Sequence, residues 1–150
     1  MVATSAGSTM AIGDVGSLPA TEDAAGYEAL TLNDIGNIES LSVFGVEYNP
    51  VTFTPLAGRK VQKYKGSYDP GTITATLAIT DDDDGQIAAE AGLAVDSDIA
   101  FSVTTQSGTV RYFSGKVMSF TTNISSVDSI TMGDVQVAIN TDIIKVLPTP

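Results

Sequence analysis

An alternation of apolar and hydroxyl-bearing residues over positions 72–80 constrains the fold more than any other part of this sequence. Threonine fills most of the positions between the apolar members of the alternation. Because successive side chains of a strand point to opposite faces of a sheet, this period predicts a β-strand with one buried and one exposed face. The apolar members are Ile73, Ala75, Leu77 and Ile79.

Further short runs of this type predict that the chain is mainly β. Apolar residues alternate over positions 99–104, and Gln106-Ser107-Gly108 is typical of a hairpin turn. The alternation over 109–122 changes parity, which indicates a bulge or strong bend near Gly115. Residues 85–92 are rich in alanine, follow four aspartates and end in glycine, as expected for a helix. Several strands and one helix predict a β-sandwich or partial barrel with one short flanking α-helix.

Two segments lie outside this pattern. Residues 1–26 are rich in Ala, Gly, Ser and Thr without a period, and we interpret them as an N-terminal arm that becomes ordered on assembly. Residues 27–150 then form the one folded domain, since 150 residues is the size of a single ordinary domain. The segment 58–66 is bounded by glycines and rich in cations, which predicts a long, extended and protruding loop or ribbon.

The composition excludes several kinds of chemistry. The chain contains no cysteine and no histidine, which removes thiolate metal sites, cysteine nucleophiles and serine–histidine triads. No nucleophile and base form a recognisable pair, so we expect no enzymatic activity, no catalytic residue and no cofactor. The chain shows no signal-peptide pattern and no apolar run near the ~20 residues of a membrane span. We therefore expect a soluble, unexported protein with no membrane partner.

The four consecutive aspartates at positions 81–84 form the sharpest local feature. A calcium-binding loop of the EF-hand type would place Gly85 at its sixth position. Thr80 would then stand at the first position and Ala91 at the last, where the loop needs a carboxylate. We therefore expect no metal site and interpret the run as a solvated acidic turn that caps the following helix.

The charge distribution singles out one segment. The net charge is −11, and residues 1–58 contain neither lysine nor arginine, yet four of the seven cations fall within 59–65. Three interpretations are open: contact with a neighbouring copy, a solvated loop, or a nucleic-acid patch. We favour intersubunit contact, because so acidic a chain repels phosphate backbones whereas a second copy offers complementary acids. The candidate contact residues are Arg59, Lys60, Lys63, Tyr64 and Lys65.

Over about residues 33–147, the order of elements resembles the major tail proteins, or tail tube proteins, of long-tailed (siphovirus-type) bacteriophages. One part of the resemblance is the extended connection from Gly45-Val46-Glu47-Tyr48-Asn49-Pro50 to Gly71. A second part is the strand that leads into Asp81-Asp82-Asp83-Asp84-Gly85-Gln86 and a short alanine-rich helix. The closing run from Tyr112-Phe113-Ser114-Gly115-Lys116-Val117 to Ile144 completes it.

The resemblance implies a subunit that assembles into hexameric rings, which stack into the hollow tail tube through which DNA is delivered. Its implied partners are further copies of itself, a tape-measure protein, a tail terminator and a distal tail protein. Genomic DNA would pass through without sequence-specific binding. The implied location is the virion tail, with assembly in the host cytoplasm. Two alternatives are a β-sandwich binding module of a virion and a ring or tube protein of a bacterial contractile injection system.

Overall fold

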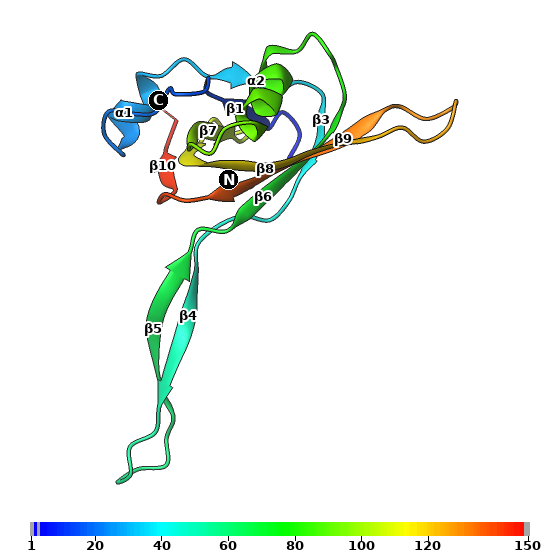
Figure 1. The fold of residues 1–150 in the computed structure, drawn as a ribbon. Coiled ribbons are helices and arrows are strands. Elements are labelled where there is room, and N and C mark those ends of the chain that lie inside the picture. The colour runs from blue at the N-terminus through cyan, green and yellow to red at the C-terminus, as the bar shows by residue number, and fades with distance from the viewer. Residues whose placement is uncertain (1, 3, 149–150) are drawn as a thin grey trace.

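The computed structural model describes residues 2 and 4–148, and Figure 1 shows a body built on one large sheet from which a slender hairpin extends. The hairpin consists of β4 and β5, which pair with each other, while the other described strands belong to the large sheet. The described elements are, in order, β1 (Thr9–Ile12), α1 (Ala24–Glu28), β2 (Asn33–Asp34), β3 (Ile38–Leu41), β4 (Glu47–Phe53), β5 (Gln62–Asp69), β6 (Thr72–Ala78), α2 (Asp84–Leu93), β7 (Ile99–Thr104), β8 (Val110–Asn123), β9 (Met132–Ile139) and β10 (Ile144–Val146).

The large sheet is antiparallel and has the strand order β2-β1-β7-β8-β9-β6-β3, with β10 beside the first part of β8. The long strand β8 links two parts of this sheet, because residues 110–115 pair with β7 and residues 115–123 pair with β9. The register with β9 shifts between Val117 and Ser119, which leaves Met118 as an extra residue on β8. Such a bulge bends a strand. The bulge predicted near Gly115 is therefore confirmed, a few residues further along the chain.

One apolar core lies between the sheet and α2. Ile73, Ala75 and Leu77 are buried on one face of β6, as their alternation predicts. Phe101 of β7 stacks on Phe113 of β8, with the ring centroids 5.6 Å apart. The small buried residues of α2 allow the helix to pack closely on β8, β2 and β1.

The predicted mainly β fold is confirmed, and so is the short helix, which is α2. The sandwich arises within a single sheet that folds over the core and, among the described residues, does not close into a barrel. The structure adds α1, whose five residues are too few to show a period in the sequence. Asp23 caps α1 by accepting a 2.7 Å hydrogen bond from the backbone N–H of Gly26. Neither described helix has the length and apolar content that a membrane crossing requires.

The N-terminal 26 residues contribute more to the body than their composition predicts. Residues 9–12 form β1, an inner strand between β2 and β7, and Met10 and Ile12 are buried in the core. An inner strand covered on both faces need not alternate in sequence. For these four residues, and for residues 24–26 at the start of α1, the structure differs from the predicted arm. Ordering of the rest on assembly remains a prediction. Residues 1, 3, 149 and 150 of the two predicted regions lie outside the described residues.

Candidate assembly surface

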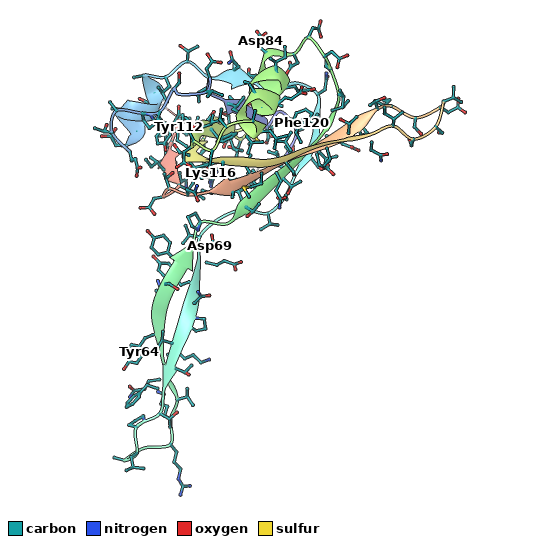
Figure 2. The ribbon with its side chains drawn as sticks, in the orientation of Figure 1. Tyr64, Asp69, Asp84, Tyr112, Lys116 and Phe120 are labelled. Atoms are coloured by element: carbon teal, nitrogen blue, oxygen red, sulfur yellow. The ribbon has the colours of Figure 1, made fainter. Side chains whose placement is uncertain are left out.

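The hairpin of β4 and β5 projects from the body and carries all five predicted contact residues (Figures 1 and 2). Its strands pair from Glu47 opposite Asp69 to Phe53 opposite Gln62, and residues 54–61 form its tip. No residue of 47–69 belongs to the described apolar core. The predicted protruding loop or ribbon is confirmed as a two-stranded ribbon.

The pairing register gives the hairpin two different faces, because neighbouring residues of a strand point to opposite sides. Its basic face consists of Pro50, Thr52, Lys63 and Lys65, and its aromatic face consists of Val51, Phe53, Gln62 and Tyr64. On the aromatic face, the exposed fractions are 52% for Val51, 58% for Phe53 and 55% for Tyr64. An isolated two-stranded hairpin is marginally stable at best in water. The aromatic face is therefore an apolar surface that lacks a partner within the described chain.

The structure places the predicted contact residues at three positions. Lys63 and Lys65 lie on the basic face, Tyr64 lies on the aromatic face, and Arg59 and Lys60 lie in the tip. The Tyr64 hydroxyl donates a 2.7 Å hydrogen bond to the side-chain oxygen of Gln62 on the same face. Sequence analysis grouped Tyr64 with the cations, but the register turns it away from Lys63 and Lys65.

The hairpin cations find no acidic partner in the part of the chain that the structure describes. The ion pairs present there are made by Lys116, whose Nζ lies 3.2 Å from Asp98 and 3.9 Å from Asp96. Lys65 instead places its Nζ 4.8 Å from the ring centroid of Tyr48, a cation–π contact. Contact of the basic segment with a neighbouring subunit stays a prediction.

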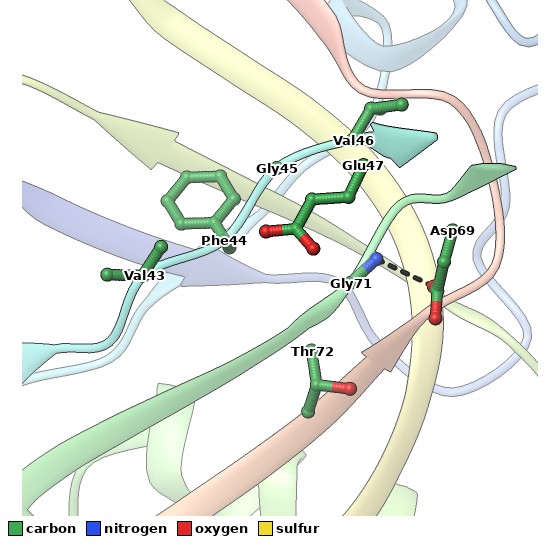
Figure 3. Close-up of a pocket in the computed structure, with 8 residues that line it drawn as sticks. All are labelled: Val43, Phe44, Gly45, Val46, Glu47, Asp69, Gly71 and Thr72. Carbon is green, nitrogen blue, oxygen red and sulfur yellow. Dashed lines mark hydrogen bonds between the residues drawn. The ribbon is translucent and has the colours of Figure 1, made fainter. Parts of the chain in front are cut away.

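Two glycine-containing connections join the hairpin to the body and border a pocket of about 350 Å³ (Figure 3). Gly45 and Gly71 have φ angles of +147° and +98°. A side chain on Gly71 would come within 3.0 Å of the Gly45 carbonyl oxygen, so the close crossing of the two connections requires glycine. Asp69 accepts a 2.8 Å hydrogen bond from the Gly71 N–H and fixes the turn. These features define the junction between the hairpin and the body.

Tyr68 ties the base of the hairpin to the body. Its hydroxyl donates a 2.8 Å hydrogen bond to Oδ1 of Asp142, which lies between β9 and β10. The Asp142 carboxylate raises the pKa of Tyr68 above its ordinary value, mainly through this hydrogen bond. The ring of Tyr68 also lies against Tyr48 on the opposite strand, with the centroids 5.2 Å apart. These contacts give the hairpin a defined attachment to the body at this junction.

The aspartate run serves as a helix cap, as predicted. Asp83 accepts two 3.0 Å hydrogen bonds, from the backbone N–H groups of Gln86 and Gly36. The buried Gln86 side chain donates 3.0 Å hydrogen bonds to the carbonyl oxygens of Gly36 and Ala78, and accepts a 2.9 Å bond from the Thr80 N–H. The run and the glutamine behind it therefore hold the start of α2 to the end of β6 and to the connection before β3.

A second exposed apolar segment lies between β8 and β9, and sequence analysis did not single it out. Ile124, Val127 and Ile130 are largely exposed there. Figure 1 shows this connection reaching beyond the body on a different side from the β4–β5 hairpin. No period marks such a segment in the sequence, because it belongs neither to a strand nor to a helix.

A curled antiparallel sheet, a flanking helix and a long projecting hairpin together characterise this fold. No family model matches this sequence, and no curated protein matches it. Solved structures do match it in three dimensions over nearly the whole chain.

The tail tube of SPP1 matches with a TM-score of 0.68 at 12% identity, over 95% of this chain and 78% of that chain. A chain of the sheath/tube terminator of PVC, an extracellular contractile injection system, matches with a TM-score of 0.67 at 13% identity, over 97% of both chains. A chain of the native gene transfer agent virion matches with a TM-score of 0.59 at 14% identity, over 77% of this chain and 88% of that chain. The chain therefore has the tail tube fold, and the predicted resemblance is confirmed at the level of the fold.

Proposed function

We propose that this chain is a non-enzymatic structural subunit of a phage tail tube, in which hexameric rings stack into a hollow conduit for DNA. The main support is the likeness to the SPP1 tail tube over 95% of the chain. Two similar assemblies give the ring size: the anti-feeding prophage baseplate is six-fold symmetrised, and the tail of the empty gene transfer agent particle has C6 symmetry.

Ring formation accounts for the edges of the large sheet. β2 and β3 stand at the two ends of its strand order, so each leaves one edge unpaired within the described chain. Exposed edges invite pairing with other chains, and a barrel that closes through several subunits removes them. A ring of subunits with adjoining sheets is thus a physical solution for this fold.

The outward face of β6, β9 and the second half of β8 suits the wall of the channel, and we call it the wall face. It consists of Thr72, Thr74, Thr76, Ala78, Lys116, Ser119, Thr121, Asn123, Met132, Asp134, Gln136 and Ala138. Its formal charges are Asp134, which accepts a 2.9 Å hydrogen bond from the Thr76 hydroxyl, and Lys116, whose Nζ lies 3.2 Å from the Asp98 carboxylate. A hydroxyl-rich wall whose one lysine is already paired with Asp98 offers DNA phosphates no free cation, so the duplex would pass without sequence-specific binding.

The proposed partners follow from the tube. The similar structures include a PVC sheath/tube terminator and an anti-feeding prophage tube-terminating cap. We propose a corresponding terminator for this tube, a tape-measure protein inside it and a distal tail protein at its far end. The subunit would assemble in the host cytoplasm and function in the virion tail without a cofactor, a metal or a membrane.

The tube of a contractile injection system is the second candidate function. It is favoured by the matches to PVC and anti-feeding prophage chains, each with a TM-score of 0.67. In PVC, such a tube is part of a sheath-tube complex. Micrographs of the native particle separate the two functions by showing whether a sheath surrounds the tube.

Light scattering and negative-stain electron microscopy of the purified protein test the proposal. We expect rings or tubes of stacked rings whose amount rises with protein concentration. A single 15.5 kDa species at high concentration, with no rings in micrographs, would contradict the proposal and favour a monomeric binding module of a virion.

A further inference from the structure

A groove of about 480 Å³ lies on the body between α2, the end of β6 and the β8–β9 connection. Ile87, Glu90 and Leu93 line it from α2, and their spacing of three residues places them on one side of the helix. Ala88 and Ala89 face the core instead. The groove therefore exposes the apolar side of α2 that the core does not cover.

The groove combines an apolar floor with an acidic rim. Ile79, Phe120 and Ile124 add apolar surface from β6, β8 and the β8–β9 connection. Asp81 and Glu90 supply two carboxylates, and none of the described lining residues is basic. The Asp81 side chain is free of the capping role, which belongs to Asp83. A ligand that carries both apolar side chains and cations would match this surface.

The tip of the β4–β5 hairpin has the complementary character. Leu56 is fully exposed, Phe53 and Val61 are about half exposed, and Arg59 and Lys60 lie beside them in the tip. No acid interrupts the chain between Glu47 and Asp69. Apolar contact with a desolvated groove and charge complementarity at its rim together favour docking of this tip.

The tip cannot reach the groove of its own chain. β6 begins at the junction below the hairpin and ends at the groove, since Thr72 borders the pocket at that junction and Ile79 lines the groove. At ~3.3 Å per residue, this strand separates the two by roughly 20 Å, and Figure 1 shows the hairpin pointing away from α2. Each copy thus presents a tip at one end and a groove at the other.

We infer that this groove receives the β4–β5 hairpin tip of a second copy of the chain in the adjoining ring. The contact joins two different surfaces, so it is heterologous, and it repeats head to tail without closing. That is the contact geometry which an open stack of rings needs. The inference rests on the proposed tube function and names the surface that accepts the hairpin.

Cysteine cross-linking tests the inference directly, because the natural chain contains no cysteine. Leu56→Cys and Ile87→Cys are combined in one chain, assembled under reducing conditions and then oxidised. A contact between rings predicts a ladder of covalent multimers that extends beyond six copies. A ladder that ends at six would place the contact within one ring and overturn the assignment. The matched control combines Leu56→Cys with Met118→Cys, because the exposed fraction of Met118 (57%) is close to that of Ile87 (51%). This control variant should give no ladder.

A charge exchange between the tip and the groove is a second, independent test. It still tests the contact if the cysteine substitutions themselves prevent assembly. Arg59→Glu with Lys60→Glu, or Asp81→Lys with Glu90→Lys, should each raise the concentration needed for tube growth about tenfold or more. The combination of all four should restore growth to near that of the natural chain. Unimpaired growth of the groove variant, or no recovery in the combination, would overturn the inference.

The outcomes also separate this inference from the proposed function. Tubes of the natural chain without the expected cross-link or charge rescue leave the tube function standing and remove the groove contact. Absence of rings and tubes from the natural chain overturns the proposed function and this inference with it.

Discussion

Reversing the four hairpin cations to glutamate should abolish tube growth and leave the subunit folded. The variant R59E/K60E/K63E/K65E makes the net charge of −11 eight units more negative. An exposed ion pair contributes about 0.2–1 kcal/mol, and reversal replaces each attraction with a comparable repulsion. Four reversed pairs therefore cost roughly 2–8 kcal/mol per subunit contact, which lowers the association constant by more than about tenfold. The fold should survive because all four residues are exposed and outside the core.

Sedimentation of assembled tubes, with far-UV circular dichroism of the subunit, measures both parts of this prediction. The single variants Lys60→Glu and Lys145→Glu form a matched pair, since both residues are exposed and each change alters the net charge equally. We expect weaker assembly from the first and natural assembly from the second. Assembly of the natural chain should also weaken between 0.15 and 1 M salt, as the screening length falls from ~8 to ~3 Å. Normal tubes from the quadruple variant would refute the reasoning.

Three further predictions concern the folded subunit. Gly85→Ala should lower the melting temperature by roughly 5 °C or more, because the new Cβ would lie 2.3 Å from the Asp34 carbonyl oxygen. Gly58→Ala is the control and should leave the melting temperature unchanged, because its Cβ would lie 3.8 Å from the nearest atom, on Pro55. The pKa of Tyr68 is raised in the folded state, so its bond to Asp142 stabilises the hairpin base fully below about pH 10 and is lost as the pH rises through the folded value. A spectrophotometric titration compared with Tyr68→Phe checks this, and an ordinary pKa for Tyr68 would contradict it. EDTA should leave the melting temperature unchanged, and a large decrease would reveal a metal site.

The strongest sequence patterns belong to elements with one side on the core. β6 alternates because its inward residues pack in the core while its threonines face outward. The aspartates before α2 mark its start because one of them caps the helix. Sequence analysis does not predict β1 and α1, for two different reasons. β1 is buried on both faces, and the short α1 is held by a tertiary contact, the 2.7 Å hydrogen bond between the Tyr27 and Ser114 hydroxyls.

The hairpin could be predicted as a basic ribbon, but its two faces could not. Its register shifts between Tyr48 and Pro50, and this shift decides which side chains share a side with Lys65. Residue types alone do not fix such a shift, because it depends on how the two strands pair. The groove could not be predicted from the sequence either. Its lining residues are spread over 79–131 and come together only when β6, α2 and β8 pack against one another.

The placement of the remaining cations decides the sign of charge in the proposed channel. Arg111 and Lys145 lie opposite each other on β8 and β10, away from the wall face. Lys116 lies on the wall face opposite Ala138, where Asp98 neutralises it at 3.2 Å. With Lys116 neutralised by Asp98, Asp134 is the remaining formal charge of the wall face, so each subunit adds a negative charge to the channel. A DNA duplex carries one negative charge per ~1.7 Å of its length, and cations on the wall would form phosphate contacts that must break at every step of DNA movement. A cryo-EM map of the tube should therefore show a channel whose facing residues carry a net negative charge. A net positive charge would contradict this prediction and indicate that the channel binds DNA as it passes.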